Sequence, residues 1–299
     1  MSSLTQRVRQ TARSAGADLV GFAPIGRFDD APPELHPRTI FPQTRTAIAV
    51  AVRHERGALK AVEEGCYWQA YNCDNYWYLN EAVAPGLLRA IVLALEGDGY
   101  TSVPVHNPFR PHVGRRIRDD VPGGPDGMMS LRVVGVAAGL GELGRSKLLL
   151  TPQFGPRQRV FAVLTDAELE PTPLLDRPIC DDCMACVRYC QAGAIGDGDR
   201  SETFAIEGRR FGHAPFDPAA CARVHRGDDP RYNPFRTDRE AEGGEPSYHK
   251  FLDHRFRHRA ICVGRGCLRA CLDHLEKAGR IETKFRTPLA EREPWELSD

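Results

Sequence analysis

Eight of the ten cysteines in this 299-residue chain lie within residues 180–271, and their spacing is that of a metal site. Cys180, Cys183, Cys186 and Cys190 are separated by two, two and three residues, which is the run typical of bacterial ferredoxins. Two intervening residues place successive thiolates on neighbouring corners of one cubane cluster. Zinc is usually held by two CxxC pairs that lie well apart, so the spacing favours an iron–sulfur cluster over zinc.

Four more cysteines complete the ligands of two [4Fe–4S] clusters. In a ferredoxin run the fourth cysteine binds the second cluster, so one run supplies three ligands to the first and one to the second. The economical pairing predicts two groups, which we name the first set and the second set. The first set is Cys180, Cys183, Cys186 and Cys271. The second set is Cys190, Cys221, Cys262 and Cys267.

The other two cysteines, Cys66 and Cys73, lie in a segment rich in aromatic residues. Their seven-residue spacing puts both on one face of a predicted helix, and the simplest interpretation is a pair of buried thiols. The aromatic side chains around them either pack in the core or line a cavity for a flat ligand. Tyr71 and Tyr76 in this segment are candidate proton donors.

Composition excludes several classes of protein. The 40 basic residues balance 40 acidic ones, which argues against a nucleic-acid-binding protein. The best apolar run, Ala47 to Val52, is far shorter than the roughly 20 residues that span a bilayer, so no membrane partner is expected. We find no apolar signal core at the N-terminus. The sequence therefore predicts a cytoplasmic protein, where thiols stay reduced.

Hydrophobic patterning predicts alternating helices and strands over the first part of the chain. Helices are expected at residues 1–16, 67–97 and 128–138, the second interrupted at Pro85-Gly86. Strands are expected at residues 17–23, 45–52, 101–105, 147–150 and 160–165. Residues 166–178 carry three prolines and mark a boundary. The fold class is therefore α/β (α+β), with one domain over residues 1–170 and a cysteine-rich domain over residues 171–299.

One block resembles a known family. Residues 137–145 read Ala-Ala-Gly-Leu-Gly-Glu-Leu-Gly-Arg, and residues 148–157 read Leu-Leu-Leu-Thr-Pro-Gln-Phe-Gly-Pro-Arg. This pattern resembles a signature of the cobalamin-dependent reductive dehalogenases and, more loosely, of the epoxyqueuosine reductases, where it also precedes two ferredoxin-type clusters. The resemblance implies a nitroreductase-like domain that holds base-off cobalamin, followed by a ferredoxin-like domain with two [4Fe–4S] clusters.

The resemblance also implies that this block contacts the corrinoid. Glycines would allow close backbone approach, and basic side chains would hold phosphate or amide groups. The predicted cofactor-binding residues are Gly139, Leu140, Gly141, Gly144, Arg145, Lys147, Gly155 and Arg157. In the tRNA-modifying relatives an acid shortly before the Gly-Leu-Gly donates a proton. Asp126, thirteen residues before Gly139, is the matching candidate beside Tyr71 and Tyr76, and it lies in a Pro/Gly-rich loop.

The expected function is that of a cytoplasmic oxidoreductase that uses cob(I)alamin and iron–sulfur clusters to reduce a small-molecule substrate. Its electron donor would be a protein such as ferredoxin or flavodoxin. Two alternatives stay open on the sequence. The chain is an iron–sulfur electron-transfer protein, or it is a reductase that activates the corrinoid of a partner protein.

Overall fold

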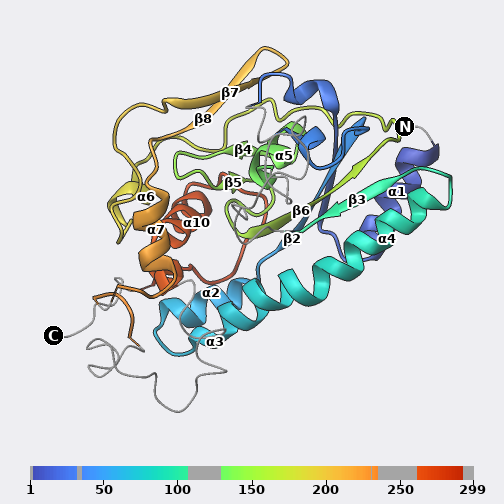
Figure 1. Cartoon of the computed structure of the whole chain (residues 1–299). Coiled ribbons are helices and arrows are strands. Elements are labelled where there is room, and N and C mark those ends of the chain that lie inside the picture. Colours follow the sequence, from blue (N-terminus) through green and yellow to red (C-terminus); the bar gives the residue numbers. More distant parts are fainter. Residues whose placement is uncertain (1–2, 32–35, 107–128, 230, 235–260, 292–299) are drawn as a thin grey trace.

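The computed structural model describes residues 3–31, 36–106, 129–229, 231–234 and 261–291 (Figure 1). Its centre is a four-stranded sheet in the order β1-β2-β6-β3. These strands are β1 (Leu19–Pro24), β2 (Thr46–Arg53), β6 (Gln158–Thr165) and β3 (Ser102–Val105). Every pair of neighbours runs antiparallel. The mixed fold class is confirmed, and the antiparallel pairing makes it an α+β arrangement.

Strand β2 is buried on both faces, and its side chains divide by size. Alternate residues of a strand point to opposite faces. Ile48 and Val50 face one layer of helices, whereas Ala47 and Ala49 face the opposite hydrophobic cluster. The small alanine face allows the elements on that side to pack close to the sheet.

The face with the large side chains is covered by α1 (Ser3–Ser14) and by a long helix that runs from Trp68 to Glu96 (Figure 1). This helix begins as α3 (Trp68–Ala70), continues as the π-helix η4 (Tyr71–Val83) and ends as α4 (Ala84–Glu96). The predicted interruption at Pro85 is wrong. The helix continues through Pro85, which stands where the π-helix η4 passes into α4.

The same helix bears on two further expectations. It is long and apolar enough to cross a membrane by length and composition, although Leu87, Leu88 and Ile91 pack in the core beside the sheet. Cys66 lies before the helix and is exposed, while Cys73 lies within η4 and is half-buried. The two thiols therefore do not form a buried pair on one helical face, because the helix starts only after Cys66.

The other face of the sheet carries α5 (Leu131–Ala137) and two hairpins. One hairpin pairs β4 (Glu142–Leu143) with β5 (Leu149–Leu150), and the other pairs β7 (Glu202–Ile206) with β8 (Arg209–His213). The sequence did not predict β7 and β8. Ile206 and Phe211 of this hairpin pack in the same cluster as α5.

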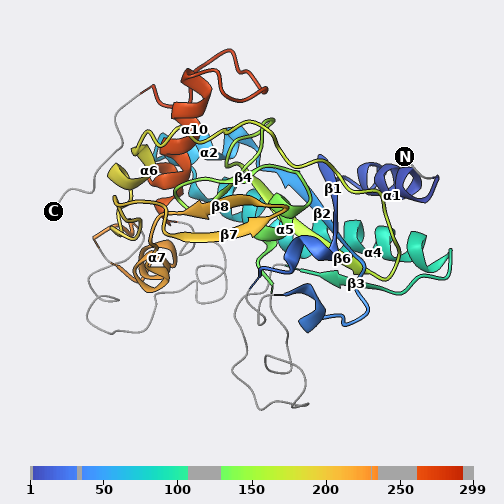
Figure 2. The same ribbon diagram turned by 90° about the horizontal axis from the view of Figure 1, so that it is seen from above.

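The cysteine-rich elements gather at one end of the molecule (Figure 2). They are α6 (Ala185–Arg188), α7 (Pro218–His225), the 3-10 turn η5 (Ile261–Gly264) and α10 (Cys267–Lys277). Three shorter elements lie in the N-terminal part: η1 (Ile25–Phe28), η3 (Pro37–Thr39) and α2 (Arg56–Glu63). Leu272 and Leu275 of α10 share a hydrophobic cluster with Leu59 and Val62 of α2. The division of the chain at residue 170 stays a prediction.

We expect Gly21→Ala to destabilise the fold by about 1–3 kcal/mol, the usual cost of overpacking a core. A Cβ at Gly21 would come within 2.0 Å of the carbonyl oxygen of Ala138, so β1 and the end of α5 would have to separate. Gly86→Ala is the matched control, because no atom lies within 4 Å of its added Cβ and alanine favours a helix. Urea unfolding of both variants measures the difference. Equal midpoints would contradict the close packing.

Candidate metal centre and the adjoining polar site

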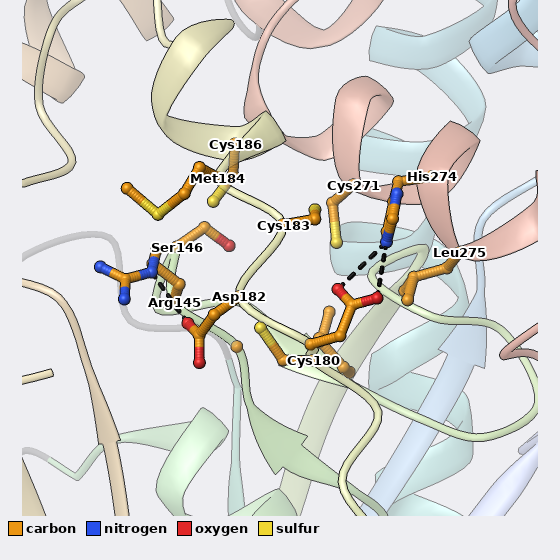
Figure 3. A pocket seen from close by; sticks show the side chains of 13 residues that line it. Arg145, Ser146, Cys180, Asp182, Cys183, Met184, Cys186, Cys271, His274 and Leu275 are labelled. Atoms are coloured by element: carbon orange, nitrogen blue, oxygen red, sulfur yellow. Dashed lines mark hydrogen bonds and ion pairs between the residues drawn. The ribbon is translucent and has the colours of Figure 1, made fainter. Parts of the chain in front are cut away.

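The four thiols of the first set line one pocket (Figure 3). Cys180, Cys183 and Cys186 come from the loop before α6 and from α6 itself, and Cys271 comes from α10. Arg145 and Ser146, which follow β4, line the same pocket. The structure thus brings a thiol 85 residues away in the sequence to the three that are closely spaced.

The local chain path explains how three thiols of one loop face the same space. Asp182 and Met184, on either side of Cys183, both have left-handed backbone, with φ of 55° and 62°. This conformation is unfavourable for residues other than glycine, so surrounding contacts must hold it. Asp182 is held by ion pairs, and the Glu142 carboxylate accepts hydrogen bonds from the backbone N–H groups of Ile179 and Cys180.

The thiols of the first set act on one another's pKa values, which shows that they lie together as one group. Desolvation raises the pKa of Cys186 to about 11, and the nearby Cys180 and Cys183 add to this rise. Desolvation also raises the pKa of Cys271 far above its ordinary value, with Cys180 and Cys186 as the next contributors. Each thiolate is therefore disfavoured by its neighbours as well as by burial.

The second set forms a separate group by the same criterion. Desolvation raises the pKa of Cys262 to about 12, and Cys221 and Cys190 raise it further. Desolvation raises the pKa of Cys267 well above its ordinary value, and Cys262, Cys190 and Cys221 raise it further. Cys186 of the first set also raises the pKa of Cys267, and Cys267 raises that of Cys271, so the two groups are neighbours. Ligation by either set stays a prediction.

Both candidate tyrosines lie beside the second set. Tyr71 is only 4% exposed, and desolvation raises its pKa, with Arg159 opposing the rise and Cys262 adding to it. The Tyr76 ring lies 4.3 Å from the Arg159 guanidinium. In a π-helix the backbone hydrogen bonds join residues that are five apart. Tyr71 and Tyr76 have this separation and lie on one side of η4. The third candidate donor, Asp126, lies outside the described residues.

Tyr71, Tyr76 and Arg159 form a polar site beside the second set. Sequence reasoning missed His54, which lies next to this polar site. His54 is 2% exposed, and neither of its ring nitrogens has a hydrogen-bond partner among the described residues. Its ring meets the edge of Tyr71 at a centroid distance of 5.6 Å. Desolvation lowers the pKa of His54 well below its ordinary value, and Arg159 and Arg157 lower it further. A histidine just after a strand carries no spacing signal that could have revealed this position.

The glycines of the Gly139–Arg157 block allow other segments of the chain to pack against its backbone. A Cβ at Gly139, where φ is +71°, would lie 2.2 Å from the carbonyl oxygen of Pro173. A Cβ at Gly141 would lie 1.9 Å from the carbonyl oxygen of Leu150. A Cβ at Gly144 would lie 2.8 Å from the Leu150 side chain. These glycines are therefore required by packing between the block and its neighbours.

The other members of the block also have protein contacts. Leu140 is buried in the core, and Gly155 stands against Leu275. Arg157 is 2% exposed and donates to the carbonyl oxygen of His54 at 2.6 Å. The ammonium of Lys147 lies 5.5 Å from the Phe216 ring. Arg145 pairs with Asp182 at 2.8 Å. A corrinoid-binding role for these residues stays a prediction.

Comparison with curated proteins places this chain beside two kinds of enzyme. It is 48% identical to the tetrachloroethene reductive dehalogenase of Desulfitobacterium hafniense over 63 residues, which is 20% of this chain and 11% of the relative. It is 38% identical to that of Sulfurospirillum multivorans over 77 residues, 25% of this chain and 15% of the relative. It is 38% identical to the epoxyqueuosine reductase of Staphylococcus aureus over 74 residues, 24% of this chain and 19% of the relative.

The matched relatives are reductive dehalogenases and an epoxyqueuosine reductase. The resemblance of the sequence to this family is confirmed, and its named members are oxidoreductases. The match spans less than a fifth of the length of each of these relatives. No family model matches the chain.

Solved structures show the same fold. A reductive dehalogenase whose structure suggests a mechanism for B12-dependent dehalogenation aligns with a TM-score of 0.55 and 15% identity. The alignment covers 98% of this chain and 40% of that one. A catabolic reductive dehalogenase in complex with 3-bromo-4-hydroxybenzoic acid aligns with a TM-score of 0.53 and 17% identity, over 73% of this chain and 28% of that one. At this identity the likeness establishes the fold alone.

The buried neutral state of His54 predicts a pH dependence of stability. The unfolded chain takes up a proton at an ordinary histidine pKa of about 6.5, whereas folded His54 resists protonation. Stability from this residue is therefore present above pH 6.5 and falls below it, by about 1.4 kcal/mol per pH unit. We expect His54→Phe to reduce the fall in unfolding free energy between pH 6.5 and 5.5 by about 1 kcal/mol, because the unfolded histidine is only half protonated at pH 6.5. Both proteins should behave alike between pH 7.5 and 8.5, and parallel slopes at low pH would contradict the assignment.

Proposed function

We propose that this chain is a cytoplasmic iron–sulfur reductase that passes electrons through two [4Fe–4S] clusters to a small-molecule substrate, with cobalamin as the further cofactor that the resemblance implies. One observation carries the proposal. Eight thiols form two adjacent groups of four, and the second group borders the polar site of Tyr71, Tyr76 and Arg159. A source of electrons therefore lies next to groups that can supply a proton.

The residues of both sets fit iron–sulfur clusters. Thiolates are the ligands that these clusters require, and each set supplies four of them. The raised pKa values of Cys186 and Cys262 reflect desolvation and repulsion between neighbouring thiolates. A cluster of iron cations offsets that repulsion, so its binding and the loss of the thiol protons are coupled. Cys180, Cys183, Cys186 and Cys271 would hold the first cluster, and Cys190, Cys221, Cys262 and Cys267 the second.

The positions of the two sets suggest the direction of electron flow. Asp181 and Asp182, next to the first set, are exposed, whereas the second set borders Tyr71. An electron donor such as ferredoxin or flavodoxin would deliver electrons at the first set, and the second set would pass them toward the substrate. The free thiols agree with the proposed cytoplasmic location, because thiols stay reduced in that compartment.

The chain's own residues supply the proton chemistry. The raised pKa of Tyr71 keeps its hydroxyl protonated at neutral pH, so it can act as a general acid. Arg159 donates to the backbone carbonyl oxygen of Asn75 at 3.3 Å and lies against Tyr76, which fixes a positive charge beside both hydroxyl-bearing rings. Such a charge stabilises negative charge that develops on a reduced substrate.

Cobalamin requires a separate test. The contacts of the Gly139–Arg157 block are with the protein itself, so they do not identify the corrinoid cradle that the resemblance implies. We therefore derive no step through a corrinoid. When bound, cobalamin would supply a low-potential cobalt centre as the immediate reductant.

The cluster assignment predicts the iron content of single variants. After anaerobic reconstitution with iron and sulfide, the unchanged protein should hold about eight iron atoms, as two [4Fe–4S] clusters require. Cys267→Ser should retain about four, because one ligand of the second cluster is lost. Cys66→Ser, which removes an exposed thiol outside both sets, should retain about eight and is the control. Full iron in Cys267→Ser would refute the ligand count.

The corrinoid part of the proposal predicts co-elution. Anaerobically purified protein is incubated with hydroxocobalamin and passed through a gel-filtration column, and its visible spectrum is recorded. Corrin bands that elute with the cluster shoulder would support a cobalamin-dependent reductase. A cluster shoulder without any corrin would favour the alternative of an electron-transfer protein and would overturn the cobalamin assignment.

A further inference from the structure

Arg145 lies in the pocket of the first cysteine set rather than at a free surface of the Gly139–Arg157 block (Figure 3). The residue is 9% exposed. Its Nε donates to Asp182 Oδ1 at 2.8 Å, and its Nη1 donates to the carbonyl oxygen of Gly198 at 2.6 Å. Its own carbonyl oxygen accepts from the N–H of Ala214 at 3.1 Å. Arg145 therefore ties three separate segments to the pocket.

The charge of Arg145 is only partly neutralised by its partner. Asp182 Oδ1 also accepts from the Nε of Arg200 at 3.0 Å, so two guanidinium groups share one carboxylate. The side chain of Asp182 is 47% exposed, whereas that of Arg145 is 10% exposed. Solvent screens the exposed carboxylate more than the buried cation. The Glu142 carboxylate, which accepts from the N–H of Cys180, adds a negative charge beside that residue, so the field of the poorly screened Arg145 cation acts on the Cys186 side of the first set.

The opposite side of the pocket does not cancel this field. There Asp181 pairs with His274, whose Nε2 lies 2.9 Å from Asp181 Oδ2 (Figure 3). Both side chains are about one-third exposed, and Arg280 lies 3.9 Å from the same carboxylate. The Arg280 cation offsets the charge of the Asp181 carboxylate, and solvent screens this exposed group. Arg145 also opposes the rise in the pKa of Cys186 that desolvation and the neighbouring thiols cause.

We propose that Arg145 is a positioning residue of the first cluster, a fixed buried cation that favours the reduced and more negative state of a cluster held by Cys180, Cys183, Cys186 and Cys271. This inference rests on the iron–sulfur part of the proposed function. The cluster gains one electron on reduction, no bond to Arg145 forms or breaks, and the guanidinium keeps its proton. Removal of this charge lowers the reduction potential of that cluster, because the added electron loses a nearby positive partner.

The test is a redox titration of reconstituted full-length protein, with dithionite as the reductant and electron paramagnetic resonance as the readout. We expect Arg145→Gln to lower the equilibrium constant for reduction of one cluster at least tenfold. For a one-electron couple this is a fall in reduction potential of about 59 mV. Arg145→Lys keeps the charge and should shift less. Asp182→Asn removes a negative charge and should shift the same cluster in the opposite direction. Arg210→Gln, at an exposed position of β8, is the control for loss of any arginine.

Each outcome decides the role of the charge. An unchanged potential in fully loaded Arg145→Gln, or an Asp182→Asn shift in the same direction, would overturn the proposal. Loss of half the iron in both Arg145→Gln and Arg145→Lys would show a clamp that depends on shape instead of charge, and would also overturn it. Loss of half the iron in Arg145→Gln but not in Arg145→Lys would support a role for the charge of Arg145. The titration needs neither substrate nor cobalamin, so a failure of the reductase proposal at either of those points leaves this result standing.

Discussion

The repulsion between closely packed thiolates is the constraint on which the cysteine-rich end of this protein depends. Eight sulfurs lie in two adjacent groups, and desolvation and mutual repulsion raise the pKa of Cys271 and Cys267 far above the ordinary value. Such a group is held together by charge compensation and by backbone contacts. Arg145 supplies the first, and the Glu142 carboxylate, which accepts from two loop N–H groups, supplies the second.

The glycine-rich block makes this arrangement possible because it brings the chain very close to itself. Gly141 and Gly144 lie against Leu150, and Gly21 lies against the end of α5. Side chains at these positions would push the β4–β5 hairpin away from its neighbours. With the hairpin in place, Arg145 reaches the loop of the first set. The block that resembles the dehalogenase signature thus positions the first cysteine set through packing.

The π-helix η4 supplies Tyr71 and Tyr76 to the polar site, which lies beside the second cysteine set. Its hydrogen-bond pattern aligns Tyr71 and Tyr76 on one side, where Arg159, His54 and the second set meet them. The amide of Asn75 in the same helix bonds the backbone N–H and C=O of Glu55 at 2.7 and 3.0 Å, which fixes the chain next to His54. A rare helix geometry held by such contacts is typical of functional sites.

The sequence by itself determined what depends on neighbouring residues. The spacing of Cys180, Cys183 and Cys186 specifies one loop around one pocket, and the continuous apolar runs of β2 and β6 specify buried strands. Only the tertiary structure decided which distant groups join them. The approach of Cys271, the antiparallel order of the sheet, the continuity of the helix through Pro85 and the burial of His54 depend on long-range packing. Residues far apart in sequence meet only when the core closes, so local spacing carries no record of those contacts.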